Sequence, residues 1–244
     1  EVGKLNIDLP QTNKAWQYLL AIKVMGTENT NDYDLWSYPA KDELKELKKG
    51  IIITRQWSAD IENKLNHGAS VLWMPDSVSM PNTVGGLFQT DYWNYRMFKT
   101  ICENNKKSAS PGTLGILTNP KHPIFNEFPT EEYTNWQWFS VIKNSRPLIL
   151  DQLAKEYRPV IQVIDNIERN HKLGLVMEFR IGQGKLLIGM SDLEKASAYP
   201  EGKQFYRSVL SYMHSGAFNP EQSITSNTLK SALFPKVAEG KIKE

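Results

Sequence analysis

The chain of 244 residues contains a single cysteine, Cys102. One cysteine excludes an intrachain disulfide and any metal site that is built from several thiolates. The four histidines, His67, His122, His171 and His214, are scattered and show no spacing typical of a zinc-binding helix. We therefore expect neither a metal nor a cofactor.

Long apolar runs and blocks of one charge are also missing. No run approaches the roughly 20 apolar residues of a membrane helix, and no signal peptide is visible. The net charge is +2, and Lys48-Lys49 and Lys106-Lys107 are isolated basic pairs, so we expect neither a membrane nor a nucleic-acid partner. Because the sequence opens at Glu1 without a methionine, we expect a mature form or a fragment.

The usual signatures of catalysis are not found in the sequence. No G-x-S-x-G motif occurs, and Cys102 falls late in a predicted helix rather than on a strand-to-helix elbow. Gly85-Gly86 lacks the lysine and serine of a phosphate-binding loop. Carboxylates are plentiful, but none has a spacing that marks a glycosidase pair. We therefore predict no catalytic residue in this chain.

Residues 1–39 are typical of antiparallel strands. Val2, Leu5, Ile7 and Leu9 suggest a first strand. From Trp16 to Val24 apolar residues alternate strictly, which is the period of a strand with one buried face. After a polar loop at residues 26–34, an aromatic strand ends at Pro39. These strands are too few to be stable alone, so we interpret residues 1–39 as the trailing edge of a β-sandwich, or as a β extension that packs on the next domain.

The pattern changes at Ala40, and residues 40–217 predict an α/β domain. Residues 51–54 form an apolar run, residues 58–66 a capped helix, and residues 69–74 a second strand, which together make a βαβ unit. Further strands are expected at residues 113–118 and 147–150. We predict a mostly parallel sheet in a three-layer sandwich. Residues 218–244 are polar and predict a loosely docked tail.

Residues 159–194 are the densest part of this pattern. They contain three predicted strands, with a glycine-containing hairpin link at residues 181–184. A polar loop, DNIERNH at residues 165–171, follows the first of these strands. Ligands bind at the carboxyl ends of the strands in open α/β sheets. We therefore expect this loop to converge with the residues that follow the other strands, including Arg55 and His122.

Aromatic and amide side chains near loops point to sugar binding, because aromatic faces stack on the C–H faces of sugars while amides bind hydroxyls. These residues have two possible roles. They contact a ligand, or they pack in the core or at a domain interface. The carbohydrate-binding candidates are Arg55, Trp57, Asp91, Trp93, Asn94, His122, Trp136, Gln137, Trp138, Asn166, Arg169 and His171.

Four motifs resemble the C-terminal region of certain glycoside hydrolase family 2 proteins, of the β-galactosidase or β-glucuronidase type. They are NDYDLWSYP, LFQTDYWNYRMF, GTLGILTNPKHPIFNEFPTEEYTNWQWF and QVIDNIERNHKLGLVMEFRIGQGKLLIGMSDLE. The resemblance covers most of residues 28–215. It implies a flavodoxin-like module of the class I glutamine amidotransferase type, preceded by the edge of a β-sandwich.

The resemblance implies a function only for a larger parent polypeptide. The family's catalytic glutamates lie on an eightfold βα barrel, and this chain has no eightfold βα pattern. We therefore expect a non-catalytic accessory module whose partners are the catalytic domains of the same polypeptide, with an oligosaccharide as a further candidate partner. The resemblance favours an exported protein. The alternatives are a small hydrolase of the amidotransferase-like fold and a dimerisation or docking domain.

Overall fold

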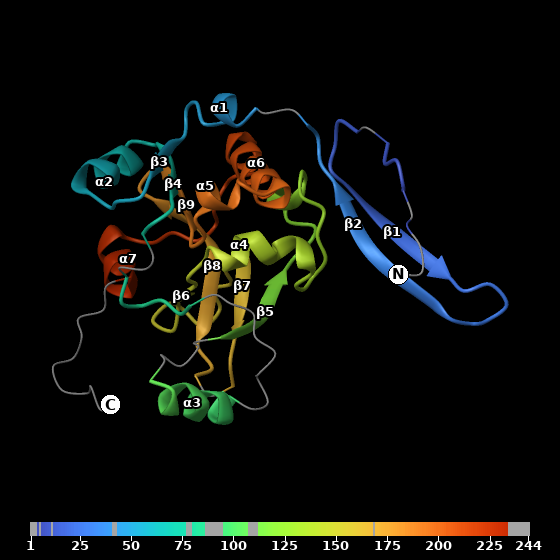
Figure 1. The fold of residues 1–244 in the computed structure, drawn as a ribbon. Helices are drawn as coiled ribbons and strands as arrows, with labels where there is room; N and C mark the ends of the chain where they lie inside the picture. Colours follow the sequence, from blue (N-terminus) through green and yellow to red (C-terminus); the bar gives the residue numbers. More distant parts are fainter. Residues whose placement is uncertain are drawn as a thin grey trace.

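The computed structural model describes residues 4, 6–10, 12–40, 43–76, 80–85, 95–106, 112–167 and 169–233. It shows a mixed α/β protein with a two-stranded antiparallel sheet and a seven-stranded mixed sheet. The two-stranded sheet is a hairpin that projects from the rest of the molecule (Figure 1). We call the remainder, residues 43–233 as far as described, the α/β body.

The hairpin consists of β1 (Trp16–Lys23) and β2 (Thr30–Ser37), which pair along their full length from Trp16↔Ser37 to Lys23↔Thr30. The alternating pattern of β1 therefore predicted this strand correctly. The polar loop predicted at residues 26–34 is shorter than expected, because the Val24 N–H donates to the Asn29 carbonyl and closes a tight turn. The described residues 6–10 form no strand, so the first predicted strand is not seen there.

The larger sheet has the strand order β3-β4-β9-β8-β7-β5, and β6 pairs with β8 beside this path. The strands are β3 (Ile52–Thr54), β4 (Ser70–Trp73), β5 (Thr113–Thr118), β6 (Leu148–Ile149), β7 (Ile161–Asp165), β8 (Lys172–Ile181) and β9 (Gly184–Gly189). Consecutive residues of the central strands are buried, so both faces of the sheet are covered.

The predicted βαβ unit is present. Helix α2 (Ala59–Asn66) joins the parallel strands β3 and β4. Its first turn is capped by Ser58, whose hydroxyl accepts a hydrogen bond from the Ile61 N–H at 3.3 Å. Ile61 and Leu65 are buried on its inner face. Local sequence thus determined both the start of this helix and the face that it buries.

The prediction of a mostly parallel sheet is wrong. Among the described pairs of strands, only β3–β4 and β4–β9 are parallel, whereas β9–β8, β8–β7, β7–β5 and β8–β6 are antiparallel. The physical reason is the length of the connections, because a parallel crossover needs about a dozen residues or more. Residues 166–171 and 182–183 are too short for that, so β7, β8 and β9 form an antiparallel meander.

The turn between β8 and β9 requires glycine. Gly182 has a φ of +58°, in the left-handed region that glycine tolerates best. A Cβ atom on Gly184 would lie 2.3 Å from the carbonyl oxygen of Leu65. The predicted hairpin link is therefore confirmed, and it packs directly against the end of α2.

Six further α-helices lie in the described part of the chain. Helix α6 packs against α1, α4 and α5, and α7 lies beside β6. The helices are α1 (Leu44–Leu47), α3 (Tyr95–Asn104), α4 (Phe139–Lys143), α5 (Leu193–Ala196), α6 (Pro200–His214) and α7 (Ser226–Leu233), with short 3-10 turns η2 (Pro123–Phe125) and η3 (Trp136–Trp138). None of the described helices is long and apolar enough to cross a bilayer.

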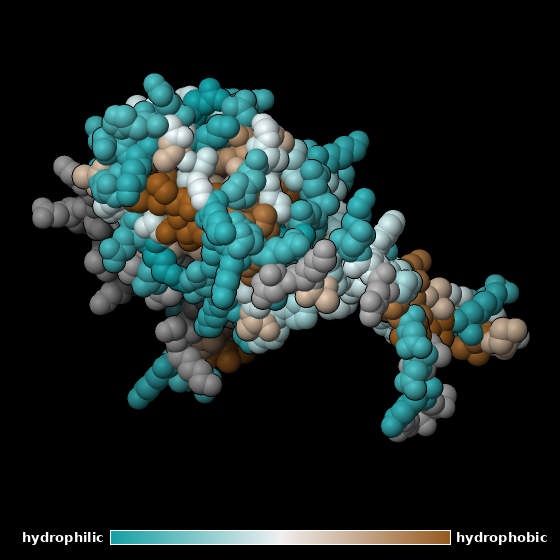
Figure 2. All heavy atoms as spheres, turned by 90° about the horizontal axis from the view of Figure 1, so that it is seen from above, coloured by the Kyte–Doolittle hydropathy of each residue, from teal (hydrophilic) through white to brown (hydrophobic). Residues whose placement is uncertain are grey.

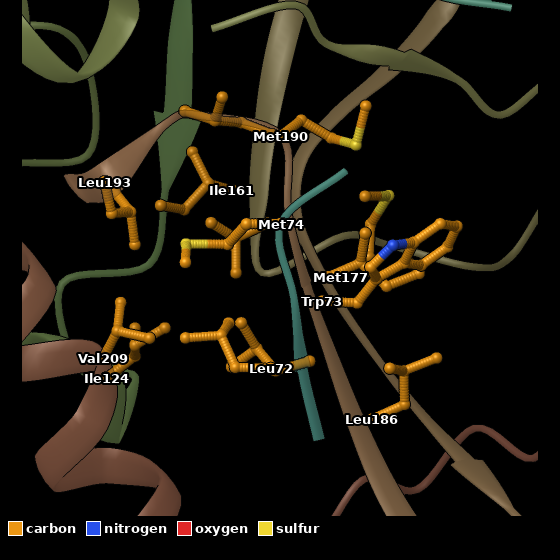
Figure 3. Packing of buried hydrophobic residues seen from close by; sticks show 14 of the residues in the cluster. Leu72, Trp73, Met74, Ile124, Ile161, Met177, Leu186, Met190, Leu193 and Val209 are labelled. Atoms are coloured by element: carbon orange, nitrogen blue, oxygen red, sulfur yellow. The ribbon is translucent and has the colours of Figure 1, made fainter. Parts of the chain in front are cut away.

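The core lies on both faces of the larger sheet. Figure 3 shows Leu72 and Met74 directed toward Val209 of α6, while Trp73 points to the other side. All of these side chains are buried. The loose tail expected from residue 218 onward is wrong for residues 218–233, because Phe218 and Leu233 are buried in the same core. The segment is polar on average, so its composition did not predict that these few apolar residues are buried.

Candidate functional site

The predicted convergence of site residues at one edge of the sheet does not occur. Because β5 runs antiparallel to β7, the loop after β5 that contains His122 lies at the opposite edge from residues 165–171. Arg55 follows β3, which is four strand positions from β7. At about 4.8 Å per strand, these positions are roughly 19 Å apart. The candidates therefore belong to separate places.

Arg55 is held in an ion-pair cluster on the surface. Its guanidinium lies 2.9 Å from Asp192 Oδ1 and 3.1 Å from Glu194 Oε2. The hydrogen bond from Arg55 lowers the pKa of the Glu194 carboxyl. Trp57 is half-buried and packs on Trp73 with ring centroids 5.0 Å apart. Both candidates thus have structural partners at the β3 end of the sheet.

Trp136 and Gln137 join the α/β body to the hairpin. The Trp136 indole N–H donates to the Asp34 carbonyl at 2.9 Å, and its ring meets Trp36 edge-on at 5.1 Å. The Gln137 side-chain oxygen accepts a hydrogen bond from the Tyr38 hydroxyl at 2.9 Å. These contacts match the reading of this loop as an interface with the β extension.

Trp138 is fully buried and cannot contact a sugar, so its assignment as a carbohydrate-binding residue is wrong. Its ring packs against Phe128 and Phe205, with centroids 5.0 Å away in both cases. The indole N–H donates to the Thr130 hydroxyl at 2.9 Å. The 3-10 turn η3 points Trp136 outward and Trp138 inward. The spacing of the two tryptophans did not predict that only one of them would be exposed.

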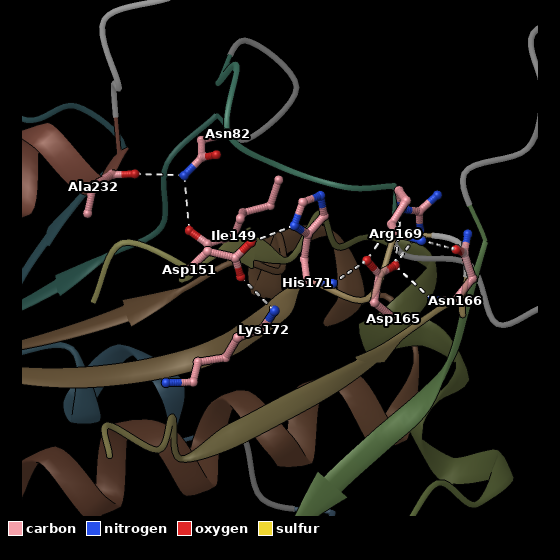
Figure 4. Close-up of polar contacts among 9 residues, drawn as sticks. All are labelled: Asn82, Ile149, Asp151, Asp165, Asn166, Arg169, His171, Lys172 and Ala232. Atoms are coloured by element: carbon pink, nitrogen blue, oxygen red, sulfur yellow. Dashed lines mark hydrogen bonds and ion pairs between the residues drawn. The ribbon is translucent and has the colours of Figure 1, made fainter. Parts of the chain in front are cut away.

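Asn166 and Arg169 belong to a network around Asp165, whose side chain is 1% exposed. Figure 4 shows this carboxylate between Arg169 and His171. Asp165 accepts hydrogen bonds from Arg169 at 2.5 Å and from the backbone N–H groups of Asn166 and His171 at 2.8 and 3.0 Å. A buried carboxylate with this many donors orders the loop, so the polar density of residues 165–171 has a structural explanation.

His171 lies at the margin of this network. Its Nδ1 is 2.6 Å from Asp151 Oδ2, and the other oxygen of Asp151 accepts the Lys172 N–H at 2.8 Å. Asp151 thereby ties the start of β8 to the end of β6. The candidates Asp91, Trp93 and Asn94 lie outside the described residues.

His122 is the candidate that faces a large cleft. The cleft has a volume of about 870 Å³ and lies between the end of β5, the start of β7 and the loop that follows α6. His122 Nδ1 accepts a hydrogen bond from the Ile124 N–H at 3.2 Å, so the neutral ring carries its proton on Nε2. Burial lowers the pKa of this imidazole. We call this cavity the His122 cleft.

Tyr212 and Glu178 form the floor of the His122 cleft. The Tyr212 hydroxyl donates to Glu178 Oε2 at 2.7 Å, and its ring meets His122 edge-on at 5.3 Å. Burial raises the pKa of the Glu178 carboxyl; the hydrogen bond from Tyr212 opposes the rise and the charge of Glu221 adds to it. Perturbed ionisable groups in a cleft of this size are a recognised mark of a ligand site.

The rim of the His122 cleft carries exposed amides and carboxylates, which include Asn119, Glu156, Asn219, Glu221 and Gln222. Its lining residues contain no serine, cysteine or lysine that could serve as a nucleophile. Across the part of the chain that the structure describes, no three His, Cys, Asp or Glu side chains group as a metal site. The cleft is equipped to bind polar groups by hydrogen bonds.

Sequence reasoning selected His122 as a site residue. It treated Glu178 only as one of many carboxylates, and it did not identify Tyr212 or Gln162. Glu178 lies inside a strand and Tyr212 inside a helix, 34 positions apart, so no motif joins them. One pattern in the sequence does point to Glu178. Glu178 is a carboxylate within the otherwise apolar run from Leu173 to Phe179, and a buried carboxylate requires a partner.

Comparison with protein-family models places most of the chain in a family. Residues 52–234 match a domain of unknown function, DUF8487, and residues 1–39 match a second one, DUF8488. The chain belongs to the DUF8487 family, since that match covers more than half of its length. A search of curated proteins found no match. Neither family model names a glycoside hydrolase.

Proposed function

We propose that this chain is a non-catalytic accessory module of a glycoside hydrolase, and that its hairpin packs on another domain of the same parent polypeptide. The observation that carries the proposal is an apolar sheet face that stays largely exposed among the described residues. Apolar side chains gather on the hairpin in Figure 2. The face includes Trp16, Ile22 and Tyr33, which are 55%, 46% and 51% exposed.

This apolar face follows directly from the register of the hairpin. Trp16, Tyr18, Leu20 and Ile22 alternate along β1 and so point to one side. Tyr33 is paired with Leu20 and therefore points to that side as well. Such a face normally packs against a second sheet or a helix. An exposed face of this kind marks a surface for another protein layer.

The opposite side of the hairpin contacts the α/β body at the end that holds Gln17 and Trp36. Trp36 on that side meets Trp136, and the Gln17 amide donates to Glu131 at 3.4 Å. The body therefore holds the hairpin in place while its apolar face is directed elsewhere. This arrangement suits a module that connects two parts of a larger protein.

The resemblance supplies the finer assignments of this proposal. The parallel strands β3, β4 and β9 with helix α2 are compatible with the flavodoxin-like, amidotransferase-type module that the motifs resemble. The covering layer would be the rest of a β-sandwich or the catalytic domains of a family 2 glycoside hydrolase. An exported location of the parent protein is part of the same proposal.

Hydrolysis of nitrophenyl β-galactoside and β-glucuronide by the purified chain tests the non-catalytic assignment. We expect no turnover above the rate without protein. Turnover that is lost in a Glu178→Gln variant would contradict the proposal and place catalysis in the His122 cleft.

A dimerisation domain is the second candidate, because a second copy of the chain could cover the same apolar face. Sedimentation of the chain alone separates the two readings. Our proposal expects a monomer, whereas a stable dimer that is dissociated by Ile22→Asp would favour dimerisation. The small-hydrolase alternative has less support, since the lining of the His122 cleft contains no serine, cysteine or lysine.

A further inference from the structure

The His122 cleft is distinct from the hairpin and is not needed for docking through the apolar face. It is an open, polar cavity of about 870 Å³, within the range of roughly 300–1,000 Å³ that ligand pockets occupy. Its floor is built from three different elements, since Gln162 comes from β7, Glu178 from β8 and Tyr212 from α6. Rigid elements therefore position the groups that a ligand would meet.

The residues that line the His122 cleft provide both hydrogen-bond donors and hydrogen-bond acceptors. Asn119, Gln162, Asn219 and Gln222 each offer an amide, which can donate and accept hydrogen bonds. The carboxyl group of Glu178 adds an acceptor, and the His122 ring lies in the same lining. Neighbouring hydroxyl groups of a polyol need such paired partners, because each hydroxyl both donates and accepts.

The charges of the cleft disfavour an anionic ligand. Glu156, Glu178 and Glu221 line it, and Arg158 is the one cationic side chain among its described lining residues. The Arg158 guanidinium already donates to the carbonyl oxygens of Lys155 and Tyr157, at 2.6 and 3.1 Å. A phosphate, sulfate or uronate would therefore meet three carboxylates against one guanidinium, so the net charge of the lining is unfavourable to it.

The walls also provide apolar contact. Leu117 is 46% exposed at the end of β5 and lines the cleft beside His122 and Pro123. A ligand that is polar at its hydroxyls and apolar on its ring faces matches this combination of amide rim and apolar wall. A small inorganic ion would not need the apolar wall or the many amides of the rim.

We propose that the His122 cleft binds an uncharged oligosaccharide, through the amides of Asn119 and Gln162 and the floor formed by Glu178 and Tyr212. This inference rests on the proposed function, because it makes the accessory module a sugar-binding one. It moves the sugar site from the tryptophans of residues 136–138 to the opposite side of the loop, where His122 lies.

Calorimetric titration with cellohexaose, xylohexaose, mannohexaose, galactohexaose and oligogalacturonate tests the inference. We expect saturable binding of at least one neutral hexasaccharide and at least tenfold weaker binding of oligogalacturonate. Asn119→Ala and Ala217→Trp, both at exposed lining positions, should weaken the binding at least tenfold, the second by filling the cleft. Trp136→Ala should leave it unchanged.

Three outcomes would overturn the inference. They are the absence of binding by every neutral sugar, tighter binding of oligogalacturonate, and unchanged binding in the folded cleft variants. Folding of each variant is checked by its thermal unfolding, and Asn119→Ala tests the site if Ala217→Trp does not fold. Docking of the hairpin is measured in a separate experiment. A cleft that binds no sugar would therefore contradict this inference without contradicting the proposed function.

Discussion

The rings of Trp36 and Trp136 meet edge-on at 5.1 Å and join the hairpin to the α/β body. Trp36 comes from β2, and Trp136 begins the 3-10 turn η3. The contact connects residues matched by two separate family models. It makes the hairpin part of one folded unit with the body.

Trp136→Ala should loosen this joint. It removes an aromatic pair worth about 0.5–1.5 kcal/mol and the hydrogen bond to the Asp34 carbonyl. We expect several-fold faster proteolytic cleavage in the turn at residues 24–29. Phe139→Ala is the matched control, because Phe139 is 61% exposed and Trp136 is 60% exposed. Equal cleavage rates in both variants would show that the contact does not hold the hairpin.

Trp138→Ala should act on global stability instead. Trp138 is fully buried among Phe125, Phe128 and Phe205, and truncation of a buried tryptophan typically costs about 3–5 kcal/mol. Urea denaturation measures this loss as a lower midpoint. A loss below about 1 kcal/mol would contradict the burial of this side chain.

Asp165→Ala should destabilise the protein by about 3–5 kcal/mol, because it leaves the charge of Arg169 without its buried partner. Asp151→Ala breaks the more exposed pair with His171 and the hydrogen bond from the Lys172 N–H. A pair near the surface contributes about 0–1 kcal/mol and a hydrogen bond about 1 kcal/mol, so we expect a smaller loss. Urea denaturation of both variants compares them. Similar losses would show that the Asp165 network is not the element that orders this loop.

The burial of the Glu178 carboxyl predicts a pH-dependent stability. Burial raises the pKa of Glu178 in the folded state, so its stabilising contribution is complete below the pKa of the unfolded chain. The contribution is lost as the pH rises through the folded-state pKa. Glu178→Gln keeps an acceptor for Tyr212 without the charge.

Thermal unfolding between pH 4 and pH 8 measures this effect. We expect the melting temperature of Glu178→Gln to rise relative to the wild type as the pH increases. Glu156→Gln, on the exposed rim of the same cleft, controls for the change in net charge. A difference that stays constant or reverses with pH would contradict the burial of the Glu178 carboxyl.

Local features of this fold could be predicted from the sequence, but the direction of its strands could not. The period of β1, the Ser58 cap of α2 and the glycine turn before β9 each depend on a few neighbouring residues. The antiparallel placement of β5 depends on pairing with β7, more than 40 positions later. The predicted convergence at one edge failed for that reason.

The candidate site was partly hidden for a similar reason. His122 was visible as a histidine in a loop after a strand, whereas Glu178 and Tyr212 meet only through the packing of α6 on β8. The polar composition of residues 165–171 predicted a ligand-binding loop. Its charges are used to order the chain around Asp165.

Our proposal makes the catalytic portion of a glycoside hydrolase, on the same polypeptide as this chain, the partner of the hairpin. Calorimetric titration of this chain with that portion, expressed separately, tests the central claim most directly. We predict saturable binding with a negative heat-capacity change, the mark of buried apolar surface. Ile22→Asp should weaken it at least tenfold. Ala21→Asp, which lies on the opposite face of β1, should bind nearly as the wild type does. The absence of binding, or equal effects of the two variants, would contradict docking through the apolar face.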